Sequence, residues 1–116
     1  MTTISQDKDV LTLINVFTVD PLHQQQLIDL LIVATENSIK KIEGFISSSL
    51  HRSIDGAKVT MYAQWQSIED YQKMRNDPDA LYYIQQALAI SRFDSAMYEV
   101  VKTFLPSTIE SFRQRD

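Results

Sequence analysis

The sequence has no cysteine, two glycines and two histidines among its 116 residues. Without cysteine it has no disulfide, no thiolate metal ligand and no cysteine nucleophile. The histidines, His23 and His51, lie far apart in the sequence, which argues against a closed metal site. The glycines, Gly44 and Gly56, each suit a structural role, so the chain has no glycine-rich phosphate-binding loop.

Long apolar runs and a basic stripe are missing as well. No apolar stretch approaches the roughly 20 residues that a membrane helix needs, and residues 1–9 have no apolar signal core. The formal net charge is -4, whereas nucleic-acid-binding domains cluster Lys and Arg to displace counterions. We therefore expect a cytoplasmic protein that binds neither nucleic acid nor a membrane.

The residues that are present suit one small globular domain. Hydrophobic residues make up 44% of the chain and charged residues 22%, an ordinary composition for a folded domain. A chain of this length buries a modest core and is marginally stable alone. We expect one domain over residues 10–105, a flexible N-terminal segment over 1–9 and a C-terminal tail over 106–116.

The hydrophobic pattern predicts strands that alternate with helices. Asp20 and Ser67 are placed as helix N-caps, Asp79 as the cap of a helix continuation, and Gly44 as the end of the first helix. Asp55-Gly56 predicts a type I′ hairpin turn, which needs positive φ at both central residues. β-Branched and apolar runs predict strands at residues 10–19, 45–54, 57–66 and 96–105.

This order, βαββαβ, predicts an α+β fold of the ferredoxin-like class. In that fold two helices cover one face of a four-stranded antiparallel sheet. The first strand is apolar on both faces, because Leu13 and Phe17 alternate with Ile14 and Val16. Two helices cannot bury both faces, and an exposed apolar sheet face marks an interface. We expect a homodimer with sheet packed on sheet.

Polar and aromatic residues on the apolar faces are the candidates for a site. Asn15 lies between Leu13 and Phe17, where it either binds a ligand oxygen or is satisfied by backbone or water. Trp65, the single tryptophan, either roofs a pocket between sheet and helices or packs in the core. His51, near the end of the second strand, is either a general base or a solvated side chain.

These residues lie within a recognisable pattern. GFISSSLHRSIDGAKVTMYAQWQSIEDY, from Gly44 to Tyr71, resembles the signature of the antibiotic biosynthesis monooxygenase family, and LINVFTVD, from Leu13 to Asp20, resembles its first strand. The resemblance covers residues 10–105 and implies a dimeric α+β barrel with a small-molecule pocket in each subunit. It also implies oxygenation of phenols or anthrones without metal, flavin or haem cofactors, because a substrate carbanion can itself reduce O₂.

The resemblance also assigns roles to residues. Met61 and Gln85 stand where the polyketide enzymes carry Asn and Arg, polar groups that would steady a substrate oxyanion. The expected catalytic residues are Trp65, Tyr71 and His51, and the expected substrate-binding residues are Asn15, Phe17, Met61 and Gln85.

Two alternative functions stay open. Haem-degrading members of the fold use an Asn, a Trp and an axial His, and Asn15 and Trp65 match the first two. No histidine lies between Ser67 and Leu105 to hold the iron. The other alternative is a non-catalytic small-molecule-binding or stress-related protein, since fold does not fix function. In that case Met61 and Leu88 would fill the pocket.

Overall fold

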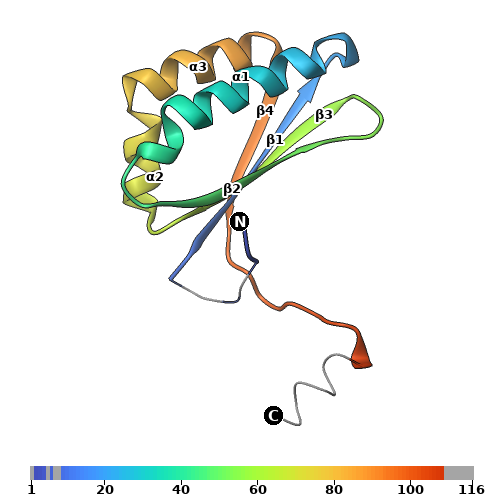
Figure 1. Ribbon diagram of the computed structural model, residues 1–116, viewed down its shortest axis with the longest axis vertical. Coiled ribbons are helices and arrows are strands. Elements are labelled where there is room, and N and C mark those ends of the chain that lie inside the picture. The colour runs from blue at the N-terminus through green and yellow to red at the C-terminus, as the bar shows by residue number, and fades with distance from the viewer. Residues whose placement is uncertain (1, 5, 7–8, 109–116) are drawn as a thin grey trace.

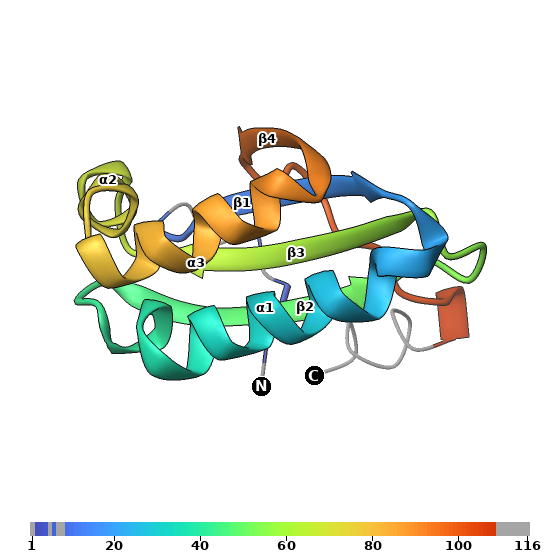
Figure 2. The same ribbon diagram turned by 90° about the horizontal axis from the view of Figure 1, so that it is seen from above.

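The computed structural model describes residues 2–4, 6 and 9–108. Its four strands form one antiparallel sheet in the order β2-β3-β1-β4, and α1 and α3 lie side by side over one face of it (Figures 1 and 2). The predicted βαββαβ order is confirmed, with the second helix divided in two. The elements are β1 (Leu11–Val19), η1 (Pro21–His23), α1 (Gln24–Asn37), η2 (Ile39–Lys41), β2 (Phe45–Arg52), β3 (Lys58–Trp65), α2 (Ile68–Arg75), α3 (Pro78–Ala89) and β4 (Ser91–Tyr98).

The register of the sheet decides which side chains reach the helices. Leu13 lies opposite Ala63, and Phe17 lies opposite both Val59 and Phe93. Residues directly opposite one another share a face of the sheet. Except for Phe93, which is partly buried, these side chains are buried in the core against α1. The interior between sheet and helices is therefore built from alternate residues of β1, β3 and β4.

Side-chain caps begin η1, α2 and α3, whereas α1 follows η1 directly and its N-cap, His23, makes no side-chain cap bond. The Asp20 carboxylate accepts from Leu22 N at 2.9 Å, and the Ser67 hydroxyl accepts from Asp70 N at 3.1 Å, as the sequence predicts. The prediction of Asp79 as a cap is wrong. Because Pro78 occupies the first turn of α3, the cap is Asp77, which accepts from Ala80 N at 3.0 Å. No described helix is both long and apolar enough to cross a membrane.

Both glycines have positive φ, and Gly56 lies in the predicted hairpin turn between β2 and β3, whereas Gly44 does not end α1. α1 ends at Asn37 and η2 follows, so Gly44, at φ 92°, opens β2 instead of ending α1. At Gly44 a Cβ atom would overlap the side chain of Asp70. Gly56 has φ 82°, but no described non-glycine residue has positive φ. The predicted type I′ turn is therefore wrong, and Gly56 N instead closes a turn on Ser53 O at 3.1 Å.

The last strand starts and ends earlier than the sequence predicts. β4 runs from Ser91 to Tyr98 rather than over residues 96–105. Its partner sets this limit, because Tyr98 pairs with Thr12 near the start of β1 and no further β1 residue continues the ladder. Beyond Tyr98 the chain leaves the sheet (Figure 1), and Val101 and Phe104 are 85% and 79% exposed.

Candidate functional site

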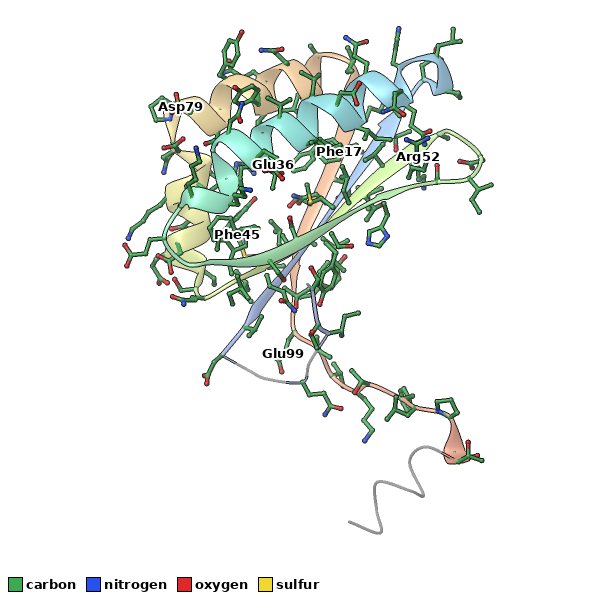
Figure 3. All side chains as sticks on the ribbon, in the orientation of Figure 1. Phe17, Glu36, Phe45, Arg52, Asp79 and Glu99 are labelled. Atoms are coloured by element: carbon green, nitrogen blue, oxygen red, sulfur yellow. The ribbon has the colours of Figure 1, made fainter. Side chains whose placement is uncertain are left out.

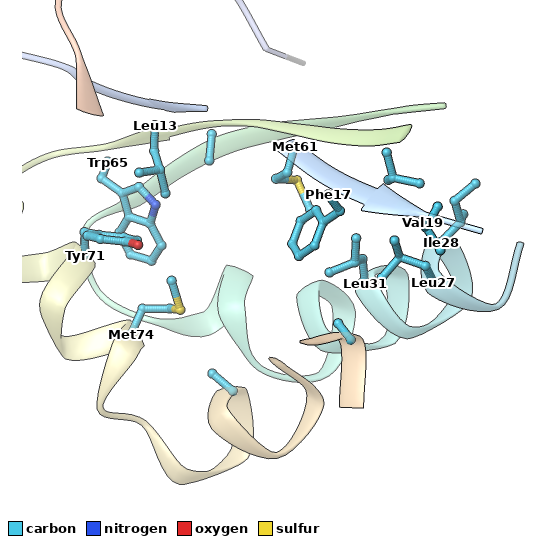
Figure 4. Close-up of a cluster of buried hydrophobic side chains, with 14 residues drawn as sticks. Leu13, Phe17, Val19, Leu27, Ile28, Leu31, Met61, Trp65, Tyr71 and Met74 are labelled. Carbon is cyan, nitrogen blue, oxygen red and sulfur yellow. The ribbon is translucent and has the colours of Figure 1, made fainter. Parts of the chain in front are cut away.

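A cavity lies between the helix-facing side of the sheet and the helices. Its volume is about 60 Å³, which is enough for several waters but small for a fused-ring ligand. Trp65, Tyr71 and Met74 lie at one end, and Met61 and Phe17 lie further along the sheet (Figure 4). Most of the lining is apolar. The lining residues with a polar side-chain atom are Asn15, Thr35, Ser48, Trp65, Tyr71 and Arg75.

Trp65 is both a packing residue and a wall of the cavity. It is the last residue of β3 and is 1% exposed. Phe45 meets it edge-on with ring centroids 5.4 Å apart, and Tyr71 does so at 6.1 Å. Phe45 points into the interior, as Phe17 does (Figure 3). These contacts fix the plane of the indole. Trp65 therefore both packs in the core and lines the cavity, so the two interpretations of this residue are compatible.

Tyr71 is paired with an arginine that sequence reasoning missed. Arg75 Nη1 donates to Tyr71 Oη at 3.0 Å, and its guanidinium carbon lies 6.0 Å from the ring centroid of Phe93. The two residues are four apart on α2, which places them on one face of the helix. The spacing of four residues between Tyr71 and Arg75 was the signal in the sequence from which this pair could have been predicted. The phenol oxygen accepts from Arg75 and keeps its own proton to donate.

Asn15 is held by a neighbouring strand. It lies opposite Met61 on β3 and Ser95 on β4, and Ser95 Oγ donates to its Oδ1 at 2.6 Å. A side chain therefore satisfies the amide oxygen. The amide nitrogen is left as a donor at the cavity wall. Ser95 was also missed, because the predicted last strand began at residue 96, one residue after it.

Two predicted site residues lie away from the cavity. His51 pairs with Thr60 on the sheet face opposite the helices, is exposed, and its Nε2 lies 2.5 Å from Ser49 Oγ. Gln85 is exposed on α3, while the preceding Ile84 lines the cavity. Adjacent residues of a helix point about 100° apart, which turns Gln85 outward. The predicted site residues that line the cavity are Asn15, Phe17, Met61, Trp65 and Tyr71.

Comparison with known proteins fits this architecture. Residues 10–86 match the family model described as antibiotic biosynthesis monooxygenase. The chain belongs to that family. It is 39% identical over 104 residues to the tetracenomycin-F1 monooxygenase of Streptomyces glaucescens, an alignment that covers 90% of this chain and 93% of that protein. The predicted family resemblance is confirmed.

Solved structures of the family share the fold. The monooxygenase ActVA-Orf6 of Streptomyces coelicolor, in complex with nanaomycin D, superposes with a TM-score of 0.75 at 27% identity, covering 87% of this chain and 96% of that chain. SnoaB, a cofactor-independent oxygenase from Streptomyces nogalater, superposes with a TM-score of 0.67 at 20% identity, covering 85% and 99%. The ferredoxin-like α+β fold is thus shared with both proteins.

Proposed function

We propose that this protein is a cofactor-independent monooxygenase that oxygenates a planar phenol, hydroquinone or anthrone. The observation that carries the proposal is the convergence of Asn15, Trp65 and Tyr71 on one apolar cavity. Small-molecule sites typically combine apolar walls with a few placed polar groups. The 39% identity to tetracenomycin-F1 monooxygenase over nearly the whole chain supports an oxygenase reaction on a compound of this class.

The reaction proposed needs proton control more than a redox centre. An acidic C–H proton passes to water at the cavity mouth and leaves an electron-rich substrate anion, which transfers one electron to O₂ to give superoxide. The substrate radical and superoxide join at carbon, the peroxide anion takes up a proton to become a hydroperoxide, and loss of water leaves a carbonyl. A CH₂ group and O₂ thus become C=O and H₂O. The protein has to hold the substrate oxyanion and exclude bulk water.

The residues divide these tasks. The Tyr71 hydroxyl, whose oxygen is engaged by Arg75, donates its proton to the substrate oxygen. The Asn15 amide nitrogen, oriented through Ser95, is a second donor. Trp65 forms the flat wall against which a planar ring stacks, with its indole N–H as a third donor.

The small volume of the cavity requires that side chains move when a ring enters. Met61 and Met74 both line it, and methionine is unbranched with three rotatable bonds, so it repacks at low cost. In this proposal the two thioethers shift to admit the substrate while the Trp65 wall keeps its place. The same flexible lining also suits the second candidate function, a binding protein without turnover, since Met61 supplies no donor to an oxyanion.

Oxygen consumption tests the proposal. We expect metal-free protein to consume O₂ with at least one member of a panel of phenols, hydroquinones and anthrones. Tyr71→Phe should lower kcat by about 100-fold, in the range for loss of a general acid or an oxyanion donor. Tyr82→Phe is the matched control, because Tyr82 is 61% exposed on α3, and it should keep the wild-type rate.

The outcomes separate the candidate functions. Quenching of Trp65 fluorescence by these compounds without O₂ consumption would favour the binding protein. Haem titration followed by absorbance tests the haem-degrading alternative, and a stoichiometric Soret shift would favour that function. Full activity of Tyr71→Phe would remove Tyr71 from the mechanism.

We also propose that the protein works as a homodimer closed by the outer sheet face, defined by Ile14, Val16, Tyr62, Ala96 and Tyr98. Ile14 pairs with Tyr62 and Ala96, and these side chains lie on the face opposite Leu13 and Phe17, which face the helices. Tyr98 is 48% exposed there. A second copy would cover the apolar residues that this face leaves exposed.

A further inference from the structure

We propose that Arg75 makes the cavity selective for planar aromatic compounds that carry a carboxylate. The inference deepens the proposed function, on which it rests for the aromatic part of the ligand. Among the residues that the structure describes, Arg75 is the one cationic residue that lines the cavity, and no acidic residue lines it. Because Arg75 is an exposed residue, its guanidinium marks the place where the cavity meets solvent.

The structure fixes the guanidinium at this place. Nη1 donates to Tyr71 Oη at 3.0 Å, and the guanidinium carbon lies 6.0 Å from the centroid of Phe93. A cation over an aromatic face is attracted to the ring. Arg75 on α2 is thus tied both to its own helix and to β4, although its side chain is long and flexible. A group held in this way is positioned to bind a ligand.

The charge of Arg75 lacks a carboxylate partner. The ion pairs of the described residues are Lys40–Glu36 and Lys73–Asp70, and neither includes Arg75. A guanidinium has five N–H donors, and the bond to Tyr71 uses one. The remaining donors form a planar fork that matches the two oxygens of a carboxylate. The free fork beside an apolar cavity is complementary to an aromatic acid.

The positions of the two groups define how such a ligand would lie. The ring would enter the apolar space between Trp65 and Met61, and the carboxylate would stay at the mouth on Arg75. The Tyr71 hydroxyl, beside the guanidinium, would then face the oxygen that is nearest the carboxylate on the ring. Arg75 therefore selects and orients the substrate, whereas the chemistry remains with Tyr71 and Asn15.

A pair of probes that differ in charge tests the inference. Anthraquinone-2-carboxylate and anthraquinone-2-carboxamide share one ring system, and binding is followed by the fluorescence of Trp65, the single tryptophan. We expect wild-type protein to bind the carboxylate about 10-fold more tightly, a typical gain for a charge-assisted pair. Arg75→Gln should abolish the preference, Arg75→Lys should restore part of it, and added salt should reduce it.

Lys73→Gln is the matched control, since Lys73 lies on the same helix and pairs with Asp70 at 3.6 Å. It should keep the wild-type preference. Equal affinities in wild type, an unchanged preference in Arg75→Gln, or no quenching by either probe would overturn the inference. Binding is measured without turnover, so a preference that depends on Arg75 in a protein that consumes no O₂ would count against the oxygenase function alone.

Discussion

The hydroxyl of Ser95 donates a 2.6 Å hydrogen bond to the side-chain oxygen of Asn15, across 80 residues of sequence. The bond joins the central strand β1 to the edge strand β4 on the side that faces the helices. It gives the single amide on the apolar face of β1 a partner and sets the direction of its N–H group. The orientation of this donor is therefore a property of the strand pairing.

Removing the Ser95 hydroxyl should disorient the amide without removing it. We expect Ser95→Ala to lower the oxygenation rate about 3- to 10-fold and the free energy of unfolding by about 1 kcal/mol, the value of one hydrogen bond. Asn15→Leu should lower the rate further. Ser49→Ala is the control, because Ser49 contacts His51 on the other sheet face. If the oxygenation rate of Ser49→Ala were as low as that of Ser95→Ala, His51 would have to be counted as a site residue.

The methionine at the centre of the cavity tests how tightly the cavity is packed. Met61 is buried and lines it. We expect Met61→Ala to lower the free energy of unfolding by about 2–5 kcal/mol, through lost burial and a larger cavity. The larger space should also tighten binding of a tricyclic ligand. Met97→Ala, at a position 43% exposed, should cost less than half as much in urea unfolding.

The hairpin between β2 and β3 contains a carboxyl group with a shifted pKa. The pKa of Asp55 lies below its ordinary value of 3.8, mainly because Ala57 N donates to the carboxylate, and also because of the Ser53 hydroxyl and the charge of Lys58. A depressed pKa favours the folded state above the unfolded pKa, and this contribution disappears as the pH falls through the folded pKa. Wild type should therefore have a higher Tm than Asp55→Asn at neutral pH, and the difference should shrink as the pH falls below the unfolded pKa and through the folded one. A constant difference would mean that the charge is not its cause.

A charge on the outer sheet face should separate the subunits. Val16 lies on β1 between Thr60 and Asp94 of the neighbouring strands, at the centre of the proposed interface. We expect Val16→Glu to convert a dimer to a monomer in light scattering at micromolar concentration, because an unpaired buried charge is costly. Ile32→Glu, a change on the exposed surface of α1, should leave the dimer intact. A monomeric wild type would contradict the interface.

Local signals were sufficient for much of the fold and for part of the candidate site. Caps at Asp20 and Ser67 and the alternation along β1 and β3 depend on neighbouring residues, so they could be recognised in the chain. The grouping of Asn15, Trp65 and Tyr71 was predicted from alternation together with the family resemblance. The roles of these residues stay predictions.

Other features depend on contacts between distant segments. The limits of β4 follow from the length of β1. The positive φ of Gly56 follows from how the hairpin turn closes on Ser53. His51 was expected near the pocket, but the register shift between Phe45 and Ser47 determines which residues of β2 face the helices. Strand side chains alternate with a period of two, so one inserted residue changes the face of all that follow.

The sequence by itself determined the order of strands and helices, the apolar character of both faces of β1 and the family, because these depend on periodicity and on residue types at short spacing. Only the tertiary structure decided that Arg75 meets Phe93, that Ser95 orients Asn15 and that Gln85 points away. Each of these depends on a crossing or register between elements far apart in the chain. The packing of the whole core sets that geometry, and no local pattern encodes it.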